Sequence, residues 1–259
     1  MKKIFLILLI LTVISLSFYY YYQAKVKEVI ILGQVVGFEI NNFDVKEEKS
    51  NTSNIVLTSL AAVGTITCVD KETNSFVALG HSISNEKNIN SLEGECYKIN
   101  FEYVKKGQMK TEGKIIAQIN KDEKIGTLKK GNEYGIYGKY DIDQISESKL
   151  IKTANRFDVI KGKAFIYLDI DGTGIKEYEV YVTNINYLNK NQNIRIKVES
   201  EELIKLAGGI ARGMSGAPVV QNGKIVGAIN CVNPENPLDA YAIFIDKLVG
   251  GEWIMRSKR

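Results

Sequence analysis

The sequence has few of the residues from which metal sites and disulfide frameworks are built. Its 259 residues include three cysteines and a single histidine, His81. Because three is an odd number and no Cys-x-x-Cys pair occurs, neither a zinc site nor a full disulfide framework is indicated. We favour three buried thiols at Cys68, Cys96 and Cys231, and one disulfide plus a buried thiol is the alternative in an exported domain. No metal ion and no organic cofactor is expected.

The sequence also lacks a large excess of either positive or negative charge. The formal net charge of +4 is spread over 34 basic and 30 acidic residues, which is not the basic patch that nucleic-acid binding requires. With 45% hydrophobic residues, 25% charged residues and only three prolines, the composition is typical of a globular protein and excludes a disordered chain. We therefore expect a folded domain that does not bind nucleic acid.

A long apolar run without charge stands near the N-terminus. Residues 4–22, IFLILLILTVISLSFYYYY, follow Lys2 and Lys3 and precede Lys25, and a helix of this length can span a bilayer. The tyrosines at its end are typical of an interfacial belt, and no small-residue cleavage site follows. We predict an uncleaved membrane anchor, with a removed signal peptide as the alternative. Because lysines flank the apolar run on both sides, the positive-inside rule hardly distinguishes the two orientations. We expect a single-pass protein with its domain outside the cytoplasm.

Most of the remaining sequence is typical of β-strands. Runs rich in Ile, Val, Tyr, Phe and Thr are separated by Gly, Asn and Asp, which predicts strands joined by turns. The expected strands cover residues 29–40, 55–69, 75–80, 96–104, 113–119, 134–140, 163–170, 178–188 and 193–198. Helices are expected only at residues 200–207 and near the C-terminus, and the polar residues 41–54 are expected to form a linker or loop. This pattern predicts an all-β fold, either a sandwich or a pair of barrels.

Ser215 lies in a glycine-rich stretch, GGIARGMSGAPVV, at residues 208–220. Glycines permit a tight turn whose successive N–H groups point at one spot, as an oxyanion hole requires. The following residues, APVVQNGKIVGAIN, predict a strand, an Asn-Gly turn and a second strand. On its own, however, such a stretch favours a structural turn over a catalytic one.

A serine nucleophile also needs a base, which is usually a histidine. His81 follows Gly80 at the end of an apolar strand, in FVALGHSISNE, where its side chain can face a cleft. A lone histidine is more often structural than catalytic. Together, the glycine-preceded histidine and the glycine-framed serine favour a catalytic pair.

These segments resemble the signature segments of the SpoIVB-type serine peptidases, the stage IV sporulation protein B family. The resemblance rests on LGHSI around His81 and on GGIARGMSGAPVVQNGKIVGAI around Ser215. It extends to SLAAVGTITCVDKETNSFVALGHSI, GTLKKGNEYGIYGKY and YAIFIDKLV, and so covers roughly residues 55–250.

The resemblance implies a fold and a set of roles. The fold would be a trypsin-like double β-barrel with the site between the barrels. Ser215 would be the nucleophile and His81 the general base, and the N–H groups of Gly213 and Ser215 would form the oxyanion hole. Members of the family are exported and membrane-tethered, and they cleave a regulatory membrane protein between two cell compartments during spore formation. The resemblance therefore implies the same compartment and a membrane-protein substrate here.

Two features depart from the family pattern. The family has an aspartate fifteen positions before its serine, where this chain has Ser200 between Glu199 and Glu201. In a continuing strand both glutamates would face away from the side of residue 200, so Ser200 is the possible third member, without the charge of a carboxylate. Loss of that carboxylate in a comparable triad costs about 10⁴ in turnover. The PDZ domain of the family is also missing, because only residues 41–54 stand at its place.

One further motif begins like a calcium-binding loop. In DIDGTGIKEYEV, Asp169 and Asp171 occupy the first and third positions, but Val180 stands where the loop needs a glutamate. We predict a hairpin turn instead. Either aspartate could supply a substitute carboxylate, although the sequence does not place them near His81.

These patterns predict three segments: an N-terminal membrane anchor (1–24), a juxtamembrane strand and linker (25–54) and a SpoIVB-type peptidase domain (55–259). The predicted function is that of a membrane-anchored, extracytoplasmic serine endopeptidase that cleaves a protein or peptide substrate. The alternative is a catalytically weak or inactive relative that acts as a tethered binding or regulatory domain.

Overall fold

The computed structural model of the chain describes residues 2–23, 26–46, 55–83, 88–89, 92–141, 143 and 149–250. After helix α1 (Lys2–Gln23), the first half contains strands β1 (Glu28–Lys46), β2 (Ile55–Val69), β3 (Ser75–Ala78), β4 (Asn88–Ile89), β5 (Glu93–Lys105), β6 (Gly113–Asn132) and β7 (Gly135–Tyr140). The second half contains β8 (Lys149–Thr153), a 3-10 turn η2 (Arg156–Asp158), β9 (Gly162–Leu168), β10 (Lys176–Ile185), β11 (Ile194–Val198), α2 (Glu201–Ala207), β12 (Ala211–Arg212), β13 (Pro218–Gln221), β14 (Lys224–Asn233), β15 (Asn236–Phe244) and α3 (Ile245–Gly250). The predominance of β-structure expected from the sequence is confirmed.

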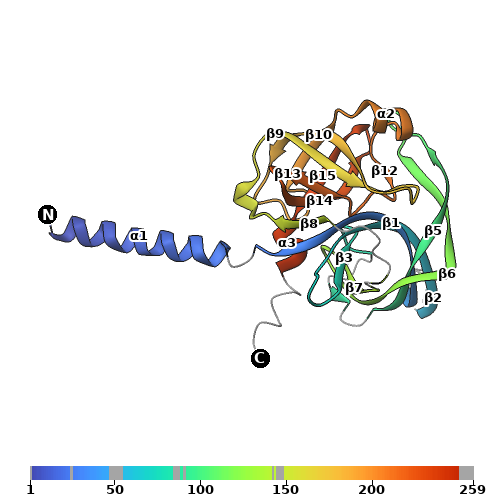
Figure 1. Cartoon of the computed structure of the whole chain (residues 1–259), viewed down its shortest axis with the longest axis horizontal. Coiled ribbons are helices and arrows are strands. Elements are labelled where there is room, and N and C mark those ends of the chain that lie inside the picture. The colour runs from blue at the N-terminus through green and yellow to red at the C-terminus, as the bar shows by residue number, and fades with distance from the viewer. Residues whose placement is uncertain are drawn as a thin grey trace.

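Strand pairing closes the sheet into two rings, which form the lower and upper halves of Figure 1. In the first ring, β1 pairs with β2, and the order continues through β3, β7, β6 and β5 back to β1. In the second ring, β9 pairs with β10, and the order continues through β11, β15, β14 and β13 back to β9. Strand β8 pairs with β1 and with β14 and so joins the rings. Because a closed ring leaves no free edge between its members, each half is a small β-barrel.

Each barrel has its own hydrophobic core. The first core is built around Phe38, Phe76 and Ile136, and the second around Ile166 and Tyr178. A third group of buried side chains lies between the barrels and includes residues of both, as well as α3: Cys68, Val77, Tyr137, Ile225, Ile243 and Leu248. Apolar contact therefore fixes the two barrels against each other.

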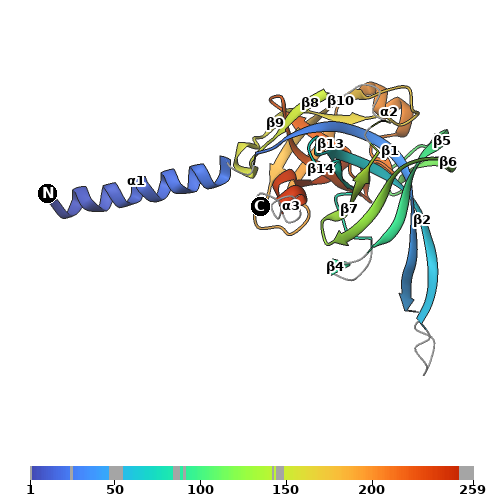
Figure 2. The ribbon, with the colours of Figure 1, turned by 60° about the horizontal axis from the view of Figure 1, so that its bottom comes forward.

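The polar stretch 41–54 was expected to be a linker, and this expectation is wrong for residues 41–46. They continue β1, where Phe43 pairs with Thr58 and Lys46 with Ile55. Cross-strand hydrogen bonding to an apolar partner outweighs the low strand propensity of this sequence. Figure 2 shows the resulting β1–β2 hairpin projecting from the body of the molecule. Residues 47–54 lie outside the described residues, and the three-segment division of the chain stays a prediction.

Helix α1 extends away from the barrels in all three whole-chain views. Its apolar side chains are exposed, with Phe5 at 71% and Ile4 at 64%. Among the residues that the structure describes, no helix combines the length and the apolarity needed to cross a membrane. The expected membrane-spanning anchor is therefore not shown.

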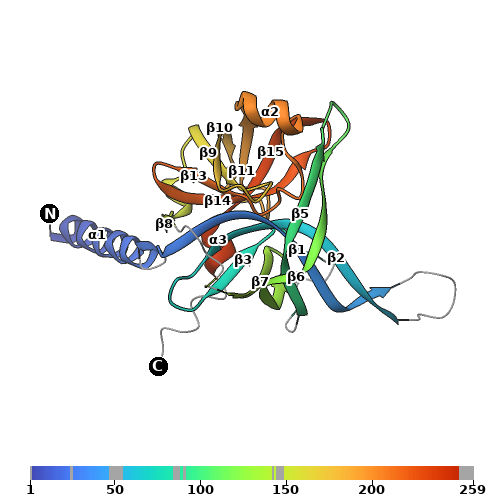
Figure 3. The same ribbon diagram turned by 45° about the vertical axis from the view of Figure 1, so that its right-hand side comes forward.

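A hairpin arm from the first barrel reaches the second. Figure 3 shows β5 and β6 rising beside α2. At the tip of this arm, Gly107 N donates a hydrogen bond to Ala207 O at 2.8 Å, and Gly113 pairs in parallel with Ala211 of β12. The arm thereby brings the residues just before β6 next to the glycine-rich segment that carries Ser215.

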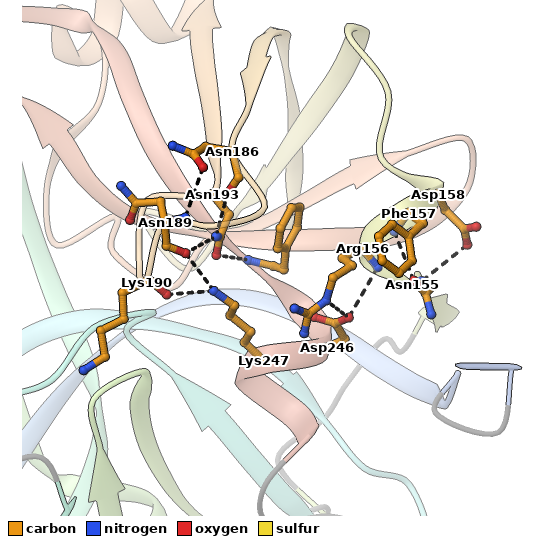
Figure 4. Close-up of polar contacts among 11 residues, drawn as sticks. Asn155, Arg156, Phe157, Asp158, Asn186, Asn189, Lys190, Asn193, Asp246 and Lys247 are labelled. Atoms are coloured by element: carbon orange, nitrogen blue, oxygen red, sulfur yellow. Dashed lines mark hydrogen bonds and ion pairs between the residues drawn. The ribbon is translucent and has the colours of Figure 1, made fainter. Parts of the chain in front are cut away.

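Helix α3 is fixed to the second barrel by an ion pair and by hydrogen bonds (Figure 4). Arg156 Nε donates to Asp246 Oδ2 at 2.7 Å, and the Asp246 side chain is only 5% exposed. The ammonium group of Lys247 donates to the main-chain oxygens of Asn189 and Lys190 at 2.9 Å each. Burial lowers the pKa of Lys247. These contacts attach the C-terminal helix to loops of the second barrel.

Candidate functional site

Ser215 lies in the connection between β12 and β13, residues 213–217, which we call the serine loop. Gly213 and Gly216 have φ values of +102° and +97°, a region that other residues enter only with strain. A Cβ atom on Gly216 would also collide with the Thr65 carbonyl oxygen. The glycines on either side of the serine are therefore required by backbone geometry, as the sequence suggested.

Two buried threonines of β2 hold the serine loop from the opposite barrel. Thr65 Oγ1 donates to Gly213 O at 2.8 Å, and Thr67 Oγ1 donates to Gly216 O at 2.6 Å. The main chain adds a third bond, from Thr65 N to Ser215 O at 2.9 Å. Both threonine side chains are completely buried. The loop that carries Ser215 is thus fixed at the junction of the two barrels.

His81 follows β3 on a turn of unusual backbone geometry. Leu79 and Gly80 have φ values of +76° and +69°, and a positive φ at leucine is a strained conformation that is concentrated at functional sites. A Cβ atom on Gly80 would lie 2.6 Å from Ile229 O, so only glycine allows this turn to approach β14. This turn packs closely against β14 and so places His81 at the junction of the two barrels.

The imidazole of His81 is oriented by a main-chain oxygen. Its Nδ1 lies 2.8 Å from Ser82 O, and because a carbonyl oxygen only accepts, Nδ1 must carry the proton. In the neutral ring this leaves Nε2 as the lone-pair nitrogen, which is the form that a general base needs. Within the described residues, no carboxylate is hydrogen-bonded to this ring.

His81, Gly213 and Ser215 line one cavity of about 560 Å³, which we call the Ser215 cavity. The structure therefore brings together the histidine, the serine and the glycine that the sequence analysis selected. The Ser215 hydroxyl is hydrogen-bonded to Leu79 O and, at 3.2 Å, to Asn230 O. No hydrogen bond joins His81 to Ser215, although both residues belong to the described part of the chain.

The N–H groups of Gly213 and Ser215 were predicted to form an oxyanion hole. Neither has a hydrogen-bond partner in the part of the chain that the structure describes. The neighbouring N–H groups, by contrast, are used: Met214 N donates to Ala211 O at 3.1 Å, and Gly216 N to Ile229 O at 2.8 Å. The N–H groups of Gly213 and Ser215 are therefore available to donate to a bound acceptor.

Ser200 does not join this site. It is the N-cap of α2, where its hydroxyl accepts from Leu203 N at 3.3 Å, and it is not among the residues that line the Ser215 cavity. The strand expected at residues 193–198 ends at Val198, so it does not continue through position 200. The structure therefore gives Ser200 the ordinary role of a helix cap and does not bring it to His81.

The two aspartates that could have replaced the missing carboxylate lie elsewhere. They belong to the turn between β9 and β10, which pair in antiparallel fashion, so the predicted hairpin is confirmed. Asp169 accepts from the N–H groups of Gly172 and Gly174 at 2.8 and 3.3 Å, and burial raises its pKa. Neither aspartate lines the Ser215 cavity.

The lining of the Ser215 cavity also includes polar side chains that were not predicted from the sequence to belong to the site, among them Glu112, Asn230 and Cys231. Glu112 precedes β6 and forms an ion pair with the largely exposed Arg212. Nothing in the local sequence indicates Glu112, because the hairpin arm alone places it there. The side chain of Asn230 is buried and donates from Nδ2 to Gly80 O at 2.6 Å.

The three cysteines are free. Cys68 and Cys96 are buried, as expected, whereas Cys231 is only partly buried and faces the cavity. Burial raises the pKa of all three thiols, so none is a thiolate at neutral pH.

The chain matches one protein family, and its structure shows a low similarity to solved structures of a protease. The family described as SpoIVB peptidase S55 matches residues 48–249. The active form of the Rv3671c protease from M. tuberculosis aligns with a TM-score of 0.41 and 9% identity, covering 85% of this chain and 79% of that chain. An inactive serine-to-alanine variant of Rv3671c from M. tuberculosis aligns with a TM-score of 0.39 and 7% identity, covering 86% of this chain and 87% of that one. No curated protein matches the sequence.

Proposed function

Because the chain belongs to the SpoIVB peptidase S55 family, we propose that it is a serine endopeptidase with Ser215 as nucleophile and His81 as general base. One observation carries the proposal. The single histidine and the glycine-framed serine, which are far apart in the sequence, line the same cavity at the junction of two barrels. The two barrels support the finer proposal that the fold is the trypsin-like double β-barrel, in which a site between barrels is expected.

The reaction would be an acyl transfer in two steps. Ser215 Oγ attacks the peptide carbonyl carbon while His81 Nε2 takes the hydroxyl proton, and the N–H groups of Gly213 and Ser215 stabilise the oxyanion. The same proton then passes from Nε2 to the leaving amine, and a water molecule hydrolyses the acyl-enzyme. Before attack, the hydroxyl has to exchange its hydrogen bonds with main-chain oxygens for one with Nε2.

The walls of the Ser215 cavity support a substrate class. Most of its lining side chains are aliphatic, including Leu60, Val63, Ile210 and Ile229, and its acidic residue Glu112 is already paired with Arg212. Buried apolar surface favours apolar groups of a ligand. We therefore propose cleavage of a protein segment that places an apolar side chain beside Ser215.

The proposed location follows from α1. Its exposed apolar side chains support attachment to a membrane. The barrels would lie outside the cytoplasm, as the family resemblance implies, and a membrane protein would then be within reach as substrate. The full chain should stay with membranes after an alkaline wash, together with a known integral protein. Recovery in the supernatant would refute membrane attachment without bearing on the peptidase.

The test of the peptidase is covalent labelling by a fluorophosphonate, which reports an activated serine. We expect labelling of the full-length protein at Ser215, its loss in S215A, and a loss of at least about 10³-fold in rate in H81A. S200A is the matched control, because it removes a serine that only caps a helix. S200A should label at the wild-type rate while losing about 1 kcal/mol of stability. A folded wild-type protein that takes no label would refute the proposal.

A second function is favoured by one specific observation. Among the described residues, the ring of His81 is bonded to a main-chain oxygen and to no carboxylate, and the Ser215 hydroxyl donates to main-chain oxygens. A tethered domain that binds a protein partner without cleaving it would need neither a carboxylate beside the imidazole nor an activated serine. In that case S215A would bind the partner and keep full biological activity, whereas the peptidase would lose it.

A further inference from the structure

Asn230 stands at an irregularity in the strand that borders the Ser215 cavity. The residues on either side of it pair with consecutive residues of β15, so Asn230 is the extra residue of a β-bulge in β14. Such bulges turn a side chain away from the regular alternation of a strand and are frequent near active sites. Here the bulge directs a buried amide, 6% exposed, toward the cavity.

This asparagine contacts the turn that carries His81 and the side chain of Ser215. Its Nδ2 donates to Gly80 O at 2.6 Å, directly before His81. The group that faces Gly80 must be the NH₂ end of the amide, because a carbonyl oxygen cannot donate. Its own main-chain oxygen accepts from Ser215 Oγ at 3.2 Å. Asn230 therefore connects the strained turn that carries the base to the loop that carries the nucleophile.

We propose that Asn230 is a positioning residue for the reaction, which fixes His81 relative to Ser215 in a site where no described carboxylate orients the imidazole. This inference rests on the proposed peptidase function. The hydroxyl groups of Thr65 and Thr67 donate to the serine loop, and Thr65 O also accepts from Leu79 N at 3.2 Å. Ser82 O lies 2.8 Å from Nδ1 of the His81 ring. The side-chain amide of Asn230 bonds to the turn that carries His81 and its main-chain oxygen to Ser215. Asn230 thereby helps to fix the distance between the two elements, the quantity on which proton transfer depends.

The test uses the full-length protein and three variants. N230A removes the amide. N230D keeps its size but has no donor when ionised, and it regains an O–H donor toward Gly80 O when protonated. N233A is the matched control, since Asn233 ends the same strand and its side chain accepts only from Glu235 N at 3.1 Å, in the turn to β15.

We expect a loss in kcat and not in binding. N230A should lower kcat and the rate of fluorophosphonate labelling about 10²-fold, with KM changed less than about threefold. N233A should behave as the wild type. N230D should match N230A at pH 8, and its deficit relative to the wild type should shrink about tenfold toward pH 6, as the buried carboxyl takes up a proton. The N230A deficit should be the same at both pH values.

The comparison at each pH is made against the wild type because other titratable groups face the same cavity. They are His81, Glu112, Arg212 and Cys231, and all four are present in every variant. The N230D-to-N230A ratio therefore isolates the introduced carboxyl group. A ratio that does not change with pH would overturn the inference, as would an N230A protein with kcat within about twofold of the wild type.

A separate readout distinguishes this inference from the proposed function. His81 is the only histidine, so its imidazole gives a unique NMR signal in histidine-labelled protein. That signal should shift in N230A and remain in place in N233A, even if the wild type has no activity. An inactive wild type refutes the peptidase, whereas an unmoved His81 signal in N230A refutes the positioning role.

Discussion

Removing the hydroxyl groups of Thr65 and Thr67 tests directly whether their hydrogen bonds hold the serine loop in place. Thr67→Val keeps the shape of the side chain but removes the donor that lies 2.6 Å from Gly216 O, in a site where the threonine is fully buried. A buried acceptor that loses its donor costs about 1–3 kcal/mol. For a chain of this size that corresponds to a fall in Tm of roughly 4–8 °C for a loss of 2 kcal/mol.

Thr65→Val removes the equivalent bond to Gly213 O at 2.8 Å and should cost a similar amount. Because both threonines restrain the same loop, the double variant should lose less than the sum of the two single losses. The loop should also hold Ser215 less precisely, so labelling by the fluorophosphonate should slow in each variant at temperatures where the protein is fully folded.

Thermal and urea unfolding measure the first effect, and labelling rates measure the second. Thr183→Val is the matched control, because Thr183 donates to Arg195 O at 3.1 Å from an exposed position and its loss should stay within about 0.5 kcal/mol. If T67V proved as stable as T183V, the claim that buried threonines fix the serine loop would fall.

Three further predictions concern backbone geometry, ion pairing and pH. Gly216→Ala should lower stability by at least about 3 kcal/mol, because a positive φ is combined with a collision, whereas Gly223→Ala, at φ +71° in open space, should cost about 1 kcal/mol. Arg156→Met removes the charged partner of the buried Asp246 carboxylate and leaves it, among the described residues, only the main-chain N–H of residue 156. It should cost about 2 kcal/mol in urea unfolding, against less than about 0.5 kcal/mol for the exposed Lys224→Met. Burial raises the pKa of Asp169 in the folded state, so the wild type should lose stability relative to Asp169→Asn as pH rises from about 3 to 6; equal curves would contradict that shift.

Local patterns were sufficient for most of the fold. The alternating β-branched and aromatic runs placed strands such as β2 and β11 within a residue of their observed ends, because side-chain alternation is a property of the strand itself. Strands that depend on a distant partner were missed. Strand β12 has only two residues and exists through its parallel pairing with β6, and the polar end of β1 is a strand because β2 lies beside it.

The residues of the site likewise fall into those that the local sequence indicated and those that only the tertiary structure placed there. The sequence alone indicated His81, Gly213 and Ser215, because a glycine-framed serine and a single histidine carry a chemical and steric signature in their own neighbourhood. Only the tertiary structure decided what surrounds them. It placed Ser200 at the cap of α2 and brought Glu112 to the Ser215 cavity. It also connected Asn230 to the turn that carries His81 and to the side chain of Ser215. These outcomes depend on strand register, on a bulge and on the packing of two barrels, all of which join residues that are remote along the chain.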